Sequence, residues 1–185
     1  MIGLILAPDV ACVLLCGVAA AIDLRSRRIP NWLTLPGIGI GLVLNTALFS
    51  IAFGIGDGAR LGLLPSLAGF LLLGLVFLLL GVINFVGMGD VKLMAAVGAF
   101  LRWPNALWAL AYVTLAGGVI AVGYAVARGR LLAVLRNLFS LTRNVVKPRE
   151  ERPEVELHRI PYGLAILVGA AWAAAANYFP ALRVP

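Results

Sequence analysis

Apolar stretches follow one another along almost the whole chain, and they limit what it can fold into. The mean hydropathy is +1.02, 62% of residues are hydrophobic and only 12% are charged. A helix needs roughly 20 apolar residues to cross a bilayer, and a lipid environment demands that each spanning segment satisfy its own backbone hydrogen bonds. The sequence therefore predicts an all-α integral membrane protein, a single domain over residues 1–185 built as a bundle of about six transmembrane helices.

The spans can be placed from the apolar runs and the polar segments between them. The expected spans cover residues 2–22, 33–53, 61–85, 91–101, 106–127 and 160–179. The fourth is short, reaching only about 17 Å at 1.5 Å per residue, so it is expected to be re-entrant or to extend back through Gly87. The glycine-rich stretch 54–58 is expected to be a loop. The first run has no basic residue before it, which favours a retained span over a cleaved signal peptide.

The polar stretch between the last two spans contains an amphipathic pattern. Residues 131–146 carry a broad apolar side and a stripe of cations, which predicts a helix lying in the membrane interface. A seventh packed helix is the alternative. The charged and proline-broken residues 147–154 are expected to form a mobile loop.

The distribution of basic residues gives an orientation. With the 25–28 loop inside, twelve of the fifteen Lys and Arg residues fall in inside loops, and only Arg60, Arg102 and Arg183 fall outside. By the positive-inside rule this places the 25–28 loop in the cytoplasm and both termini outside. The net charge of +7 is thus explained by topology, and no nucleic-acid partner is expected.

Two aspartates lie at the cytoplasmic ends of spans. Asp23 closes the first span, and Asp90 stands in Gly87-Met-Gly89-Asp90 at the start of the fourth. A carboxylate near bilayer depth is costly and marks a functional site by default. Two close carboxylates share one proton, so that one can act as base on a water while the other polarises a carbonyl. The plain alternative is that each aspartate marks a helix end in the wet interface.

The two glycines before Asp90 are expected to have a conformational role. Gly87 and Gly89 let the backbone turn and allow a close approach by another segment. Asp9 and Asp57 are expected on the outer side, with no part in the pair.

Other polar residues carry weaker expectations. Asn31 starts the second span as a helix cap or as a hydrogen-bond partner near Asp23, and Lys92 either tunes the acid or extends to the interface. Cys12 and Cys16 share a helix face too far apart for an intrahelical disulfide, and we interpret them as packing residues. His158 is the only histidine and we interpret it as a loop residue; neither a metal nor a cofactor is expected.

Three sequence blocks resemble the signature segments of the prepilin peptidases, which are membrane aspartyl proteases of the Gly-x-Gly-Asp class. The blocks are residues 23–34, beginning Asp-Leu-Arg-Ser-Arg-Arg-Ile-Pro-Asn, residues 87–94, Gly-Met-Gly-Asp-Val-Lys-Leu-Met, and residues 160–166, Ile-Pro-Tyr-Gly-Leu-Ala-Ile. The resemblance implies that Asp23 and Asp90 are catalytic. It also implies cleavage of prepilin or pseudopilin leaders at the cytoplasmic face of the inner membrane.

The chain differs from the longer members of that family. It has no paired Cys-x-x-Cys and nothing before the first span, so it is expected to be a short form without the N-methyltransferase region. In this it resembles tight-adherence (Flp) and preflagellin peptidases. Two rival functions are a small proton-coupled transporter, which would favour mid-membrane aspartates and repeat symmetry, and a non-enzymatic subunit of a pilus or secretion machine.

Overall fold

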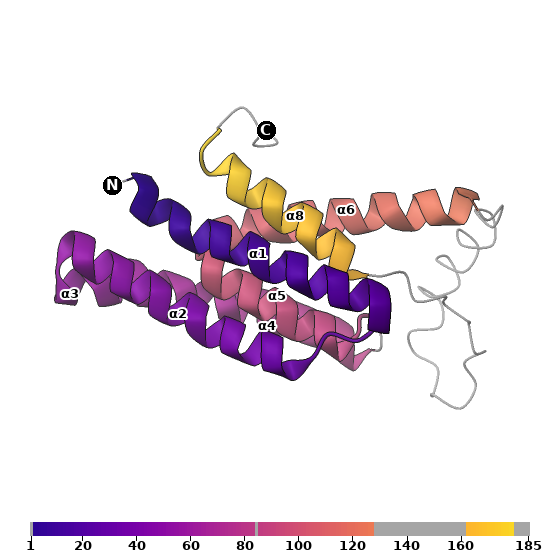
Figure 1. Ribbon diagram of the computed structural model, residues 1–185, viewed down its shortest axis with the longest axis horizontal. Coiled ribbons are helices and arrows are strands. Elements are labelled where there is room, and N and C mark those ends of the chain that lie inside the picture. Colours follow the sequence, from indigo (N-terminus) through magenta and orange to yellow (C-terminus); the bar gives the residue numbers. More distant parts are fainter. Residues whose placement is uncertain (1, 84, 128–161, 180–185) are drawn as a thin grey trace.

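The computed structural model describes residues 2–83, 85–127 and 162–179, and within these ranges the chain is helical with short connections and contains no strand. Figure 1 shows the helices lying roughly along one direction. They are α1 (Ile2–Ser26), α2 (Asn31–Phe53), α3 (Ile55–Gly58), the π-helix η1 (Ala59–Leu63), α4 (Leu64–Val82), α5 (Met88–Leu101), α6 (Asn105–Ala127) and α8 (Tyr162–Ala176). The predicted all-α architecture is confirmed.

Four of these helical segments are long and apolar enough to cross a membrane. The candidate spans are Leu6–Ser26, Asn31–Phe53, Ile55–Val82 and Asn105–Gly123, and Tyr162–Ala176 is a shorter apolar helix. The protein is therefore a multi-pass membrane protein. The predicted amphipathic helix 131–146 and the loop 147–154 lie outside the described residues.

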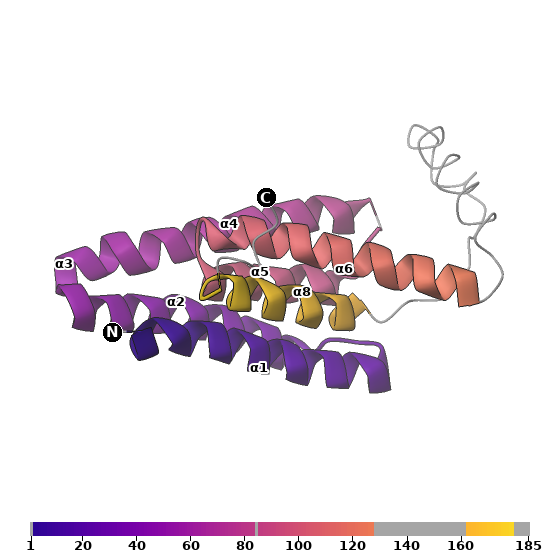
Figure 2. The same cartoon turned by 90° about the horizontal axis from the view of Figure 1, so that it is seen from above.

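The short α5 is the central helix of the bundle. It packs most extensively against α4, then against α2 and α1, and it also touches α6 and α8; both ribbon views show it in the middle of the other helices (Figures 1 and 2). Every residue of 93–101 is buried. Neighbouring helices, and not lipid, surround this segment, so it has no need of the roughly 20 residues of a lipid-exposed span. The helix reaches further back than the predicted start at residue 91, because α5 begins at Met88 with Gly87 as its N-cap; whether it is re-entrant stays a prediction.

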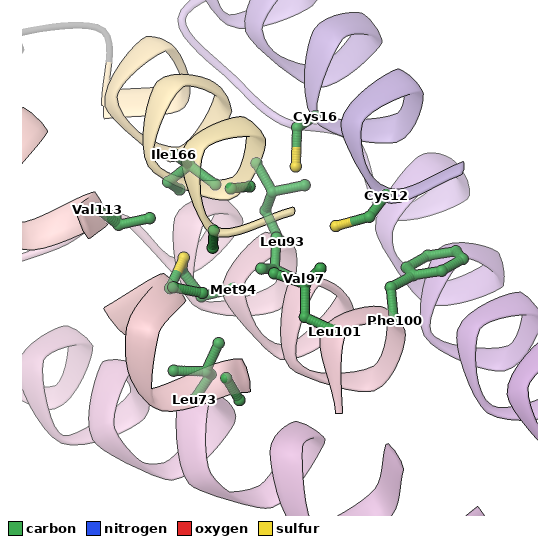
Figure 3. Close-up of a cluster of buried hydrophobic side chains, with 14 of the residues drawn as sticks. Cys12, Cys16, Leu73, Leu93, Met94, Val97, Phe100, Leu101, Val113 and Ile166 are labelled. Carbon is green, nitrogen blue, oxygen red and sulfur yellow. The ribbon is translucent and has the colours of Figure 1, made fainter. Parts of the chain in front are cut away.

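Small side chains let the neighbours of α5 approach closely. A β-carbon on Gly98 would clash with the backbone of Gly69 in α4, and one on Gly41 in α2 would lie 3.1 Å from Ala99. In membrane bundles such small residues replace the hydrophobic drive that associates helices in water. Figure 3 shows larger side chains, among them Leu93, Val97 and Ile166, filling the space between the elements.

The loop predicted at residues 54–58 is wrong. Only Gly54 breaks the helix, with φ 95°, and the chain then re-enters helix as α3 and η1 and runs on into α4. Gly58 and Gly62 serve close packing, because a β-carbon on Gly58 would collide with Ser50, and one on Gly62 would lie 2.6 Å from the Asn45 carbonyl oxygen. Composition alone does not distinguish these two uses of glycine.

Candidate active site

The two aspartates singled out in the sequence meet at one end of the bundle. Asp23 lies in the last turn of α1 and is 8% exposed, while Asp90 lies in the first turn of α5 and is half-buried. The two carboxyl groups are close enough that the charge of Asp23 acts on Asp90. Both lie at helix ends, whereas a proton relay through the membrane would favour aspartates near mid-helix.

Asp23 is held by the start of the last described helix. The backbone N–H of Gly163, in the first turn of α8, donates a hydrogen bond of 3.1 Å to Asp23 Oδ2. The positive end of the α8 dipole therefore points at this carboxylate. The chain leaves α1 just beyond Asp23, where the Arg27 N–H bonds the Asp23 carbonyl at 2.8 Å and Arg27 takes a φ of 52°.

Asp90 is electrostatically different from an ordinary surface carboxyl. It lies outside the four candidate spans. Burial, followed by the charge of Asp23, raises the pKa of Asp90 from 3.8 to about 7, against a smaller lowering by a hydrogen bond from the backbone of Gly87. Near neutral pH the Asp90 carboxyl can therefore still hold a proton.

The Gly-x-Gly-Asp turn packs tightly on both sides. A β-carbon on Gly89 would lie 3.1 Å from Ile29 Cβ and 3.4 Å from the Ile29 backbone, and one on Gly87 would lie 3.0 Å from Asp90 Oδ2. Gly89 thus lets α5 lie directly against the loop that follows Asp23, and Gly87 leaves room for the Asp90 carboxyl. Gly118, in the middle of α6, offers a contrast, because nothing lies within 4 Å of its added β-carbon.

Asn31 and Lys92 join the starts of α2 and α5. Lys92 Nζ donates a hydrogen bond of 2.8 Å to Asn31 Oδ1. The expectation that Asn31 caps the second span is wrong, since Pro30 is the N-cap of α2 and no side chain caps that end. The fixed φ of proline suits this boundary position, which leaves the Asn31 side chain free to join the start of α2 to α5.

The sequence missed the contribution of Tyr162 and Gly163. Both lie in the block 160–166, but nothing in that block indicated that its amide would reach a carboxylate 140 residues away. The Tyr162 ring packs against Phe77 with ring centroids 6.3 Å apart and lies against Gly117 of α6. These contacts position the start of α8 over Asp23.

The described part of the chain contains no cluster of side chains suited to bind a metal ion. Across residues 2–83, 85–127 and 162–179, no three His, Cys, Asp or Glu side chains gather in a way that could hold an ion. Cys12 and Cys16 are buried free thiols that pack against the core. His158 lies outside the described residues.

Comparison with known proteins supplies the relationship. A model described as the type IV leader peptidase family matches residues 10–122, a stretch that includes both aspartates. The chain is 33% identical over 115 residues to a protein of Burkholderia pseudomallei (strain 1026b) named prepilin leader peptidase/N-methyltransferase, covering 60% of this chain and 35% of that one.

Other relatives carry the same name. The protein of Dickeya chrysanthemi is 39% identical over 92 residues, which are 46% of this chain and 30% of the relative, and that of Aeromonas salmonicida (strain A449) is 34% identical over 110 residues, 58% and 36%. The chain spans about a third of the length of the curated relatives it matches. No solved structure matches it significantly. Because the matching family model covers more than half of its residues, the chain belongs to the type IV leader peptidase family.

Proposed function

We propose that this protein is a membrane aspartyl endopeptidase that removes the leader peptides of type IV prepilin-like precursors, with Asp23 and Asp90 as its catalytic pair. The observation that carries the proposal is the meeting of these two carboxyls at one end of the bundle, where the charge of Asp23 acts on Asp90. Family membership supports the reaction class. Two carboxyls that share one proton are the chemical requirement of an aspartyl protease.

The surroundings of the two aspartates support different roles for them, one as base and the other as proton donor. Asp23 receives the Gly163 N–H and acts as the ionised base, while Asp90 holds the proton. Asp23 takes a proton from a water whose oxygen adds to the scissile carbonyl carbon, and Asp90 gives its proton to the carbonyl oxygen. The leaving amine then takes the proton from Asp23 as the C–N bond breaks, and the hydroxyl proton returns to Asp90 as the carbonyl re-forms.

The same end of the bundle is proposed to face the cytoplasm. Arg25, Arg27 and Arg28 are exposed directly after Asp23, and basic loops favour the inside of the inner membrane. Both termini would then lie outside. A prepilin or pseudopilin could keep its apolar helix in the bilayer while its leader junction reaches the aspartates. Asn31 and Lys92, which are hydrogen-bonded to each other near the starts of α2 and α5, are candidates for contacting that leader.

The test is leader cleavage by variants that change one charge at a time. Asp23→Asn and Asp90→Asn should each abolish cleavage of a co-reconstituted prepilin while the protein stays folded. Asp57→Asn is the matched control, because Asp57 is exposed in α3 and should cleave at the wild-type rate. Mass spectrometry of the product defines the cut. Full activity in either variant of the pair would refute the catalytic assignment.

A further inference from the structure

A second carboxylate of α1 is buried at the other end of the bundle. Asp9, expected from the sequence to be a bystander on the outer side, is 2% exposed. Its Oδ2 accepts two hydrogen bonds of 3.0 Å, from Asn177 Nδ2 and from the Tyr178 hydroxyl. Both donors follow directly after the end of α8. The catalytic proposal uses none of these groups.

Asp9 and Asp23 together hold α8 at both of its ends. They are fourteen residues apart on α1, about four turns, so they share a face and lie roughly 21 Å apart along the axis. Asp23 binds the first turn of α8 through Gly163, and Asp9 binds the residues just beyond its last turn. One helix thus presents two acceptors to the two ends of another.

The central helix α5 has an ionisable group at each end, and each is influenced by the charge of one aspartate of α1. It starts near Asp90 and ends at its C-cap Arg102, a buried residue with a φ of 63°. The Arg102 guanidinium lies 4.6 Å above the ring of Phe49 in α2. Burial lowers the pKa of Arg102, and the charge of Asp9 opposes that lowering. The Asp9 carboxylate therefore acts on the end of α5 opposite to Asp90.

Between its two aspartates α1 packs against the core through apolar contacts, which include the partly buried Val13 and Leu15. The buried residues there are small, namely Cys12, Cys16, Ala19 and Ala20. Small apolar surfaces pack closely but have no directional preference. A slip of one residue would move Asp23 by about 1.5 Å along the axis. Directional contacts at the far end oppose such a slip.

Burying the polar groups at this end of the bundle costs free energy. Among the described residues, Asp9 Oδ1 and Arg102 Nε are buried without a hydrogen-bond partner. Buried charges of this kind contribute little net stability, and their best-attested use is to specify one register among alternatives. A register function accounts for keeping a carboxylate and a guanidinium where apolar side chains would cost less.

We propose that Asp9, with Arg102, Asn177 and Tyr178, is a positioning group that fixes the axial register of α1 against α5 and α8 and thereby sets how Asp23 meets Asp90. This inference rests on the proposed catalytic pair for its effect on cleavage. Its structural part stands without that pair.

The test compares Asp9→Leu with Asp9→Asn. Asp9→Leu removes both acceptors and the charge, and a slip of about 1 Å should lower kcat on the order of 100-fold while KM stays within about twofold. Asp9→Asn keeps one acceptor oxygen, so kcat should fall by only about threefold. The pH midpoint of kcat should move downward in Asp9→Leu, because Asp23 no longer acts fully on Asp90. Tyr178→Phe removes a single hydrogen-bond donor to Asp9 and replaces Asp9→Leu if that variant does not fold. Its kcat and the pH midpoint of kcat should both be lower than in the wild type.

Two controls separate register from general weakening. Asp57→Leu changes an exposed acid and should behave as wild type. Leu73→Ala leaves a cavity in the core and should lower the melting temperature without moving the pH midpoint. A readout independent of cleavage is the distance between spin labels at Leu14→Cys and Val168→Cys, both on exposed positions, with Cys12 and Cys16 replaced by alanine. It should shift or broaden in Asp9→Leu only.

The outcomes distinguish this inference from the proposed function. An unchanged label distance and pH midpoint in Asp9→Leu, with Asp23→Asn inactive, would overturn the register proposal and leave the catalytic pair standing. A changed label distance in Asp9→Leu, with Asp23→Asn still active, would support the register and overturn the catalytic pair.

Discussion

Replacing Gly163 with alanine should misplace the Asp23 carboxylate without removing any chemical group. The added β-carbon would lie 3.0 Å from Asp23 Oδ2, 3.2 Å from Asp23 Cβ and 3.3 Å from Ala20 Cα. All three distances are tighter than ordinary contact, so Asp23 or the start of α8 must retreat by a few tenths of an ångström. The same movement stretches the 3.1 Å hydrogen bond from the Gly163 N–H.

The size of the effect follows from that displacement. A misplacement of about 1 Å costs on the order of 100-fold in rate, so a few tenths should lower kcat by about three- to tenfold. KM should stay within about twofold, because the substrate contacts are not changed. Stability should hold, since alanine favours helix over glycine by up to about 1 kcal/mol. The assay is single-turnover cleavage of a reconstituted prepilin, with thermal unfolding measured on the same preparations.

The matched control is Gly118→Ala in α6. Nothing lies within 4 Å of its added β-carbon, so this variant should cleave at the wild-type rate. Gly117 is not a suitable control, since its β-carbon would lie 3.1 Å from the Tyr162 ring. Equal kcat values for Gly163→Ala and Gly118→Ala would show that α8 does not position Asp23 for catalysis, and the role given to that hydrogen bond would have to be abandoned.

Three further results are expected. Gly89→Val should lose most of its turnover and Gly87→Ala less, whereas Gly118→Val should keep the wild-type rate, because, of these three glycines, only Gly89 lies against Ile29 of the loop after Asp23. Equal cleavage rates for Gly89→Val and Gly118→Val at matched membrane levels would show that the Gly-x-Gly-Asp segment has no special role. Burial and the Asp23 charge raise the pKa of Asp90 to about 7. Its proton is present below that pH and lost above it, so kcat should fall as pH rises through about 7, and a flat or rising profile from about pH 6 to 8 would exclude Asp90 as the proton donor. Single cysteines at Arg27→Cys and Arg152→Cys, in a background without Cys12 and Cys16, should escape an impermeant thiol reagent in intact cells; labelling of either would reverse the proposed orientation.

Local signals in the sequence determined the helical membrane architecture. Hydropathy acts on each segment alone, so the long spans could be placed to within a few residues, as for α2 and α6. The Gly-x-Gly-Asp spacing likewise indicated which carboxyl starts α5 and where the backbone needs room. Charge bias gave an orientation that stays a prediction, because the arrangement of helices does not by itself distinguish the two sides of a membrane.

Only the tertiary structure decided what surrounds each of these groups. The central place of α5 follows from packing with several other helices, and this explains why its short apolar run is sufficient. The hydrogen bond from Gly163 to Asp23 and those from Asn177 and Tyr178 to Asp9 join residues 140 or more positions apart. Hydropathy, charge and turn signals describe segments one at a time, whereas these contacts depend on the axial register between helices, which close side-chain packing and buried polar pairs fix together.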